Sequence, residues 1–217
     1  LASLPSLGHR EKARDLGVRP PQGAVTRTVR KGVEPKATTR LIFTGACKYS
    51  FENREVLGAL RQLLDIRLRE VLREDKGGTY GVAVSANCSS IPYEHYQLSV
   101  SFGSAPERVD ELVNAVFTVI DSIKGGAVSD SNLTKIRELR IRSHETQLKE
   151  NGSWLSAMAD ADEDGRDQRD FLRIPDLVNT VTRQQVRDAA RLYLRREQVA
   201  RFSLLPEEPA KPAPVKP

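Results

Sequence analysis

The sequence predicts an α+β domain in which helices pack on an antiparallel sheet. Segments with alternating apolar residues lie near both ends and in the middle of the chain, with amphipathic helical segments between them. The order strand, helix, hairpin, helices, strand differs from the regular alternation that builds a parallel sheet. A chain of 217 residues, of which 39% are hydrophobic and 29% charged, suits one large domain or two small ones.

The chain is expected to have three parts. Residues 1–25 are rich in proline and glycine and are expected to form a lead-in from a preceding domain, with one helical turn around Glu11 to Asp15. Residues 26–207 carry the periodic segments of the domain, and residues 208–217 form a proline-rich tail without core residues. The first residue is Leu1, without an initiator methionine or a signal-peptide pattern, so we expect a piece of something longer.

Five segments have the pattern of strands. Residues 26–33 read as a short edge strand, and residues 39–49 are apolar on both faces, which favours an interior place in the sheet. Residues 80–89 and 96–102 alternate between apolar and small or polar side chains and are expected to pair as an antiparallel hairpin. Residues 199–205 form the last expected strand.

The helices are expected from apolar stripes and from capping signals. Residues 52–73 form an amphipathic helix, and Pro106 and Glu107 mark the start of a second one. A third helix runs from Ser129 to about Glu150, and a shorter fourth one starts near Trp154. Thr182 begins the last helix, three residues before a glutamine. The third helix is expected to direct the following residues inward: Leu133, Ile136 and Leu139.

Charge and cysteine content narrow the classes of function. The net charge is +5, but the basic residues are scattered among acids without a basic stripe, so nucleic-acid binding is disfavoured. No apolar run approaches 18 residues, so no membrane span is expected. Cys47 and Cys88 lie in separate expected strands; they could pair if they are neighbours, but buried free thiols are the favoured interpretation.

The stretch from Leu72 to Val82 is the strongest candidate site. It ends a long helix, turns at Gly77 and Gly78, and opens a strand. Arg73 and Tyr80 flank this turn, and a guanidinium and a phenol are both donors suited to a developing oxyanion. The alternative is structural, because an arginine in the last helical turn complements the helix dipole and a tyrosine often packs.

This arrangement resembles a known family. An Arg-x6-Tyr spacing across a helix, a glycine turn and a strand is similar to the Arg/Tyr motif of the pitrilysin and insulinase zinc peptidases. The resemblance runs from about Lys31 to Glu207, and within the family the chain is most similar to the long bacterial members. Four further segments carry it: Lys31–Lys36, Ile42–Gly45, Ser101–Pro106 and Leu204–Glu207.

The resemblance implies a function for the motif. It implies a two-layer domain that is the zinc-free, C-terminal half of a zinc metalloendopeptidase and closes like a clamshell over a peptide. Arg73 and Tyr80 would stabilise the transition state, and the substrate-binding positions would be Gly77, Gly78, Thr79 and Gly81. Zinc would be held by another domain or a partner subunit, so the isolated chain is expected to be inactive. A bacterial periplasmic or envelope setting is suggested by the resemblance alone.

Metal-binding patterns in the chain itself are incomplete. The family's zinc motif is His-x-x-Glu-His, and His9, His95 and His144 are not spaced to share a metal. The run from Asp160 to Gly165 resembles half of an EF-hand loop, but its twelfth position is Phe171, so we expect a solvated acidic loop. The main alternative function is a scaffold or interaction subunit of the same fold, without catalysis.

Overall fold

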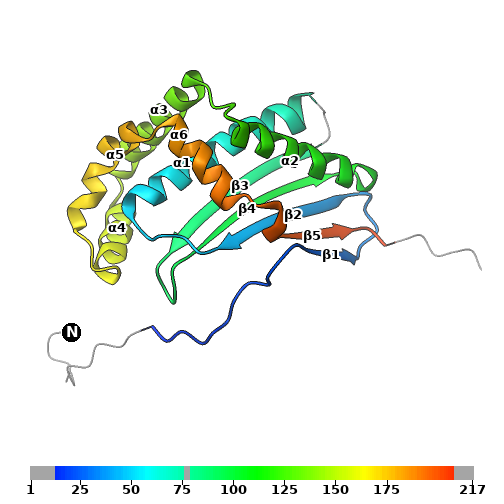
Figure 1. Cartoon of the computed structure of the whole chain (residues 1–217), viewed down its shortest axis with the longest axis horizontal. Coiled ribbons are helices and arrows are strands. Elements are labelled where there is room, and N and C mark those ends of the chain that lie inside the picture. Colours follow the sequence, from blue (N-terminus) through cyan, green and yellow to red (C-terminus); the bar gives the residue numbers. More distant parts are fainter. Residues whose placement is uncertain (1–12, 76–78, 208–217) are drawn as a thin grey trace, which may run out of the picture.

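The computed structural model describes residues 13–75 and 79–207. Within them a five-stranded sheet is covered on one face by helices, as Figure 1 shows. The order of strands across the sheet is β1-β5-β2-β4-β3. The strands are β1 (Val25–Arg30), β2 (Ala37–Gly45), β3 (Thr79–Ser89), β4 (His95–Ser104) and β5 (Val199–Leu205). This arrangement confirms the predicted α+β class with helices packed on a sheet.

The helices begin where the sequence supplies side chains that cap them. Ser50 accepts a hydrogen bond from the backbone of Asn53, and Thr182 forms a capping box with Gln185. The α-helices are α1 (Phe51–Arg69), α2 (Val109–Gly125), α3 (Asp130–Gln147), α4 (Asn151–Glu163), α5 (Ile174–Thr180) and α6 (Arg183–Tyr193). Short 3₁₀ segments precede α2, α5 and β5, and a π-helical segment follows α1.

The strand pairing follows the predicted positions with one difference. β2 lies between β5 and β4, β1 is an edge strand, and β3 and β4 form the expected antiparallel hairpin. The sheet is nevertheless mixed, because β1 runs parallel to β5, with Val25 opposite Ala200. These two strands come from opposite ends of the domain, and their relative direction depends on the whole path of the chain between them.

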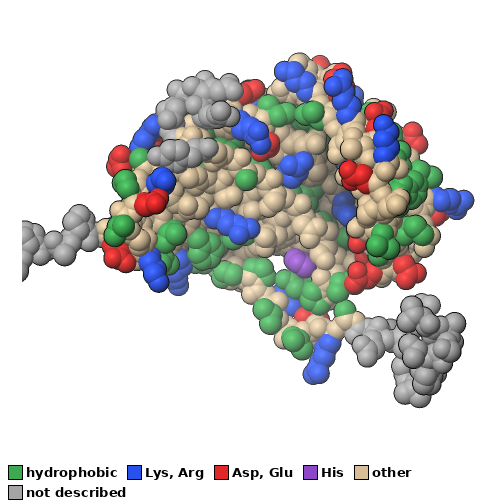
Figure 2. All heavy atoms as spheres, turned by 180° about the vertical axis from the view of Figure 1, so that it is seen from behind, with side chains coloured by type: hydrophobic (Ala, Val, Ile, Leu, Met, Phe, Trp, Pro, Cys, Tyr) green, Lys and Arg blue, Asp and Glu red, His purple; other side chains and the backbone are tan. Residues whose placement is uncertain are grey.

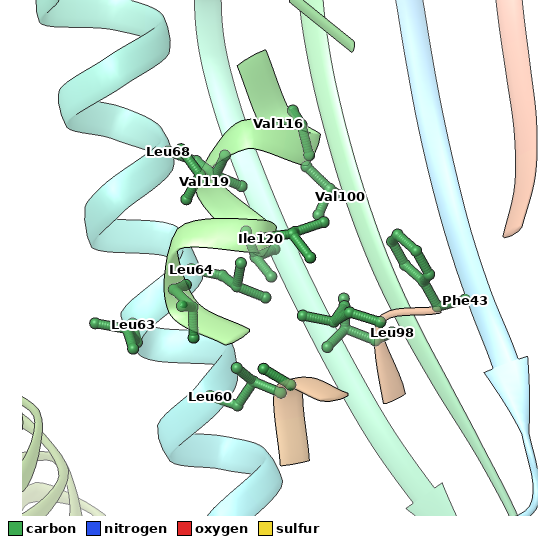
Figure 3. Close-up of a cluster of buried hydrophobic side chains, with 14 of the residues drawn as sticks. Phe43, Leu60, Leu63, Leu64, Leu68, Leu98, Val100, Val116, Val119 and Ile120 are labelled. Atoms are coloured by element: carbon green, nitrogen blue, oxygen red, sulfur yellow. The ribbon is translucent and has the colours of Figure 1, made fainter. Parts of the chain in front are cut away.

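The core lies between the sheet and helices α1 and α2 (Figure 3). Phe43 of β2 and Leu98 and Val100 of β4 are fully buried there. The same buried cluster contains Leu60, Leu63, Leu64 and Leu68 of α1 and Val116, Val119 and Ile120 of α2. Full burial of one such side chain contributes about 1.5–3 kcal/mol, so this cluster fixes how α1 lies over the sheet.

Two local expectations are wrong. Leu139 is 52% exposed, because Arg140 takes the inward position one turn after Ile136 and pairs with the buried Glu55. Residues 13–24 contain no helix, so the helical turn expected around Glu11 to Asp15 is absent from its described part. The remaining residues of that turn, and the whole tail 208–217, lie outside the described residues, and the domain boundaries stay a prediction.

The expectation of free thiols is also wrong, because Cys47 and Cys88 form a disulfide. Gly45 at the end of β2 and Cys88 of β3 both lie opposite Tyr96 of β4. The two strand ends are therefore level, and the chain leaving β2 brings Cys47 to Cys88. The periodicity of the sequence does not show that both strands register on the same tyrosine.

No single helix among the described residues is long and apolar enough to cross a membrane. The bent pair Pro106–Gly125 and Asp130–Gln147 passes that test only when its two helices are combined, on length and composition.

Candidate functional site

The candidate motif lies where α1 runs into β3. The α-helix ends at Arg69, and its backbone continues as a π-helical segment, Glu70–Asp75. Leu72 in this segment is fully buried and fixes it to the core, while the backbone of Arg73 follows directly. π-helical segments are rare and are often found at functional sites. The predicted helix therefore extends to the motif, with a change of winding in its last turns.

The start of β3 carries a second irregularity, at Tyr80. Thr79 lies opposite Ser104 and Gly81 lies opposite Gly103, so the backbone of Tyr80 is an extra residue without a partner across the hairpin. Such a β-bulge bends a strand locally, and bulges are over-represented beside active sites. The two halves of the motif thus each coincide with a break in regular backbone.

The structure describes only part of the predicted site. The side chains of Arg73 and Tyr80, and the whole of Gly77 and Gly78, lie outside the described residues. The structure places the backbones of Arg73 and Tyr80 in the π-helical segment and in the bulge, on either side of residues 76–78. Their catalytic and binding roles stay predictions.

Thr79 holds the first residues of β3 in place. Its hydroxyl lies 2.7 Å from the carbonyl oxygen of Gly103 on β4 and accepts a hydrogen bond of 3.1 Å from the backbone N–H of Gly81. Gly81 is exposed, a Cβ atom added to it would meet nothing within 4 Å, and its φ lies outside the left-handed region. No contact with the described residues therefore requires glycine at this position.

The motif opens onto the edge strand β3 and the uncovered face of the sheet. Ser85 and Asn87 of β3 and Gln97 of β4 are exposed on this face. Figure 2, which looks at the molecule from behind, shows a broad area of backbone and uncharged polar atoms with few charged groups. β3 (Thr79–Ser89) contains no charged residue, whereas the opposite edge strand β1 carries two arginines, Arg27 and Arg30. The two edges of the sheet thus differ in chemistry.

The acidic run after Ala159 is not the solvated loop that the sequence suggested. Asp160 and Asp162 lie in helix α4, so they do not form a loop around an ion. Asp164 is largely buried and binds three donors: the hydroxyl of Tyr49, the hydroxyl of Ser90 at 3.0 Å and the guanidinium of Arg166 at 3.1 Å. In the described part of the chain, no group of three His, Cys, Asp or Glu side chains could hold a metal.

The pKa values of Asp164 and His144 are shifted from their ordinary values. Burial alone would raise the pKa of Asp164, but the hydrogen bonds from Tyr49, Arg166 and Ser90 lower it overall. Burial lowers the pKa of His144, as does the positive charge of Arg140. The first shift keeps Asp164 ionised, and the second keeps His144 neutral. Sequence reasoning missed both roles, because the partners of these residues come from distant segments.

A family model for the peptidase M16 inactive domain matches residues 1–139, which is more than half of the chain. The chain belongs to the peptidase M16 family. The matched region includes the positions of Arg73 and Tyr80, and it confirms the predicted resemblance to the zinc-free domain of pitrilysin-type peptidases.

Known peptidases and solved structures of proteases are similar to this chain. The chloroplastic stromal processing peptidase of Pisum sativum is 24% identical over 138 residues, which cover 63% of this chain and 11% of that protein. The periplasmic protease PqqL from Escherichia coli has the same fold, with a TM-score of 0.75 at 20% identity over 86% of this chain and 21% of that one. The inactive peptidase domain of a candidate zinc protease from Bordetella parapertussis matches with a TM-score of 0.68 at 17% identity, covering 86% of this chain and 99% of that one.

The matches to the curated relatives cover only part of those proteins. The chain spans about a tenth of the length of the curated relatives it matches. The structural matches lie below 25% identity and therefore support the fold. The M16 domain described here is of the type called inactive in its family.

Proposed function

We propose that this chain is the zinc-free half of an M16 metalloendopeptidase, which closes over a peptide and supplies Arg73 and Tyr80 to the transition state. The observation that supports this best is the backbone of the motif. A π-helical segment holds Arg73 and a β-bulge holds Tyr80, close together in sequence and beside an open sheet edge. A purely structural junction has no need for two irregularities at these residues.

The proposed roles follow from the chemistry of the two side chains. The phenol of Tyr80 donates a hydrogen bond to the carbonyl oxygen of the scissile peptide bond as this oxygen becomes negatively charged. The guanidinium of Arg73 fixes the substrate and stabilises the same charge. Donors aimed at a developing oxyanion typically contribute about 10²–10³ in rate. Gly77, Gly78, Thr79 and Gly81 are the positions where the substrate backbone approaches.

The substrate we propose is an extended peptide that adds a strand to β3. β3 is an edge strand of 11 residues without charge or proline, and natural edge strands are usually protected by such residues. Recognition by backbone pairing supplies hydrogen bonds that are independent of the peptide's sequence. A peptide on this edge lies beside the bulge at Tyr80, which joins substrate binding to the catalytic motif.

We further propose that zinc is held outside this chain, by another domain or by a partner subunit. The described residues supply no set of three metal-binding side chains, and the three histidines of the sequence lack the His-x-x-Glu-His spacing. Zinc activates the attacking water in such peptidases. Each role given above to a residue of this chain concerns the peptide and not the metal.

The disulfide supports an oxidising compartment for the protein. Disulfides persist in secreted and periplasmic proteins and are rare where thiols are kept reduced. Cys47 and Cys88 are bonded and both are buried. We therefore propose a periplasmic or otherwise extracytoplasmic setting, as the name of the Escherichia coli protease states for that protein.

The experiment that tests this function separates the two halves. The 217-residue chain, the zinc-bearing half and their mixture are each incubated with an unstructured peptide and with zinc. We expect cleavage by the mixture or by the joined protein and none by this chain alone. Zinc-dependent cleavage by this chain alone would contradict the proposal. If no parent or partner carries zinc, the domain is a scaffold instead.

A further inference from the structure

A cavity lies away from the motif, between helices α1, α3 and α5 and the far end of β3. Its volume is about 350 Å³, which is the size of a small-molecule site. α1 and α3 form two walls, and Ala86 to Cys88 of β3 form the floor. None of these residues belongs to the Arg73–Tyr80 motif.

The lining of this cavity is strongly basic. Four arginines line it, and all four are half-buried: Arg54, Arg61, Arg137 and Arg140. The single acid in the lining is Glu55, which is buried. Arg140 binds both carboxylate oxygens of Glu55, at 2.9 and 3.1 Å, so this pair neutralises itself. Three positive charges remain on the wall of one cavity.

These three arginines have no carboxylate partner within the described part of the chain. Arg54 donates to the hydroxyl of Tyr49, and Arg137 donates to the carbonyl oxygen of Val181 at 2.6 Å. The Nε atom of Arg137 is buried and has no hydrogen-bond partner among the described residues. Arg61 forms no ion pair with any described residue. Half-buried guanidinium groups carry a desolvation cost that a counter-charge offsets, and this fold supplies none.

The other polar groups of the lining suit the same ligand. Gln62 of α1 and Ser143 and Gln147 of α3 place amide and hydroxyl donors around the cavity. Guanidinium groups bind carboxylate and phosphate oxygens in pairs of hydrogen bonds, which is the reason that arginine dominates sites for these anions. A cavity with several neutral donors and three guanidinium groups that have no carboxylate partner among the described residues matches a ligand with several anionic oxygens.

We propose that this cavity binds a small multivalent oxyanion, a phosphate compound or a polycarboxylate, between α1 and α3. Arg61 and Arg137 hold the anion from opposite walls, and Arg54 contributes from the first turn of α1. The bound anion ties α3 to α1 and to the end of β3. This site is independent of the proposed peptidase function.

Binding of inorganic pyrophosphate and of citrate to the 217-residue chain tests the site. The two probes separate phosphate from carboxylate chemistry, and binding of either one supports the proposal. Isothermal calorimetry at low ionic strength should show saturable binding that weakens as sodium chloride is added. Arg61→Gln should raise the Kd about tenfold or more, because it removes a charge-assisted contact. Arg137→Gln should act in the same direction.

Arg142→Gln provides the matched control. Arg142 lies on the same helix α3, is exposed and does not line the cavity. The Arg142→Gln substitution removes the same charge as Arg61→Gln. It should leave the Kd within about twofold of that of the unaltered chain, since an exposed charge outside the cavity acts only at long range. Two results would overturn the proposal: no saturable binding of either probe to the unaltered chain, or equal weakening by Arg142→Gln and Arg61→Gln. Arg61→Gln decides the matter if Arg137→Gln fails to fold.

Discussion

His144 is the most buried titratable side chain of the helical layer. It is 1% exposed, its ring packs edge-on against Phe171 at 5.0 Å, and its Nδ1 has no partner among the described residues. Burial and the charge of Arg140 lower its pKa below the ordinary value of 6.5, while Glu55 and Glu145 act weakly in the opposite direction. The folded protein therefore holds His144 in the neutral form.

The resulting prediction concerns stability against pH. The unfolded chain binds a proton at His144 near pH 6.5 and the folded chain does so only at lower pH, so the free energy of unfolding should fall as the pH drops below 6.5. Denaturant unfolding measured between pH 7.5 and about pH 5 checks this. His144→Phe keeps a ring against Phe171 and should remove most of the pH dependence, whereas His95→Gln should retain it. An unchanged slope in His144→Phe would contradict the assignment.

Asp164 gives a second prediction at this scale. Asp164→Asn leaves the half-buried Arg166 without its counter-charge and weakens the bonds from Tyr49 and Ser90. We expect a loss of about 3 kcal/mol in the free energy of unfolding. The matched control is Asp162→Asn, an exposed position two residues earlier, which should change stability by less than about 0.5 kcal/mol. Equal effects of the two substitutions in urea unfolding would refute the role of Asp164.

Gly81 tests substrate approach without disturbing the fold. Gly81→Ala adds a Cβ atom where nothing lies within 4 Å and where φ is outside the left-handed region, so the melting temperature should not fall. If a peptide adds to β3, the extra methyl group meets the substrate, and kcat/KM of the complete enzyme should fall about tenfold. Gly125→Ala, at the end of α2, is the control and should leave kcat/KM unchanged. Full activity of Gly81→Ala would argue against peptide pairing at this position.

At the scale of elements, the disulfide ties the loop between β2 and α1 to β3. Cys47 precedes α1 and Cys88 lies near the end of β3, and 41 residues separate them in sequence. Replacing both by alanine should lower the free energy of unfolding by about 4 kcal/mol, since a loop of this length gains that much freedom in the unfolded chain. Denaturant unfolding of this variant and of the unaltered, disulfide-bonded protein measures the difference in the free energy of unfolding. A loss below about 1 kcal/mol would show that packing alone holds these elements.

The elements that the sequence predicted are those with apolar periodicity or with a start signal such as a capping residue. α1, α2, the β3–β4 hairpin and β5 were found because their periodicity depends on nearby residues. α5 and the 3₁₀ segment Gln168–Arg173 were not predicted, since each spans only one or two turns and shows no clear periodicity. The parallel pairing of β1 with β5 was missed because no local pattern specifies it.

The same distinction applies to the candidate sites. The motif at Arg73 and Tyr80 is contiguous in sequence and was therefore recognised, although its π-helical segment and bulge were not. The disulfide, the cluster around Asp164 and the basic cavity each join segments far apart in the chain. One signal was readable for the cavity: Glu55 and Arg140 occupy the inward-facing positions of two amphipathic helices. A charge on an apolar stripe requires a partner, which here is the charge on the other helix.

At the scale of the whole molecule, the domain is organised around one open edge. Helices cover one face of the sheet, the disulfide fixes the far end of β3, and the motif lies at its near end. The edge strand between them is uncharged and unpaired on its outer side within the described residues. This arrangement supports the proposal that the domain offers a peptide one edge and one pair of donors, and that the hydrolytic centre belongs to another half of the enzyme.

The most direct test of this account is the turnover of the complete enzyme with Tyr80→Phe. The substitution removes a single hydroxyl, and circular dichroism establishes that the fold is intact. We expect kcat to fall about 10²–10³-fold, with a much smaller change in KM, because the lost hydrogen bond forms in the transition state. Zinc content should not change. An unaltered kcat in a folded, zinc-loaded Tyr80→Phe enzyme would contradict the central claim and identify the domain as a scaffold.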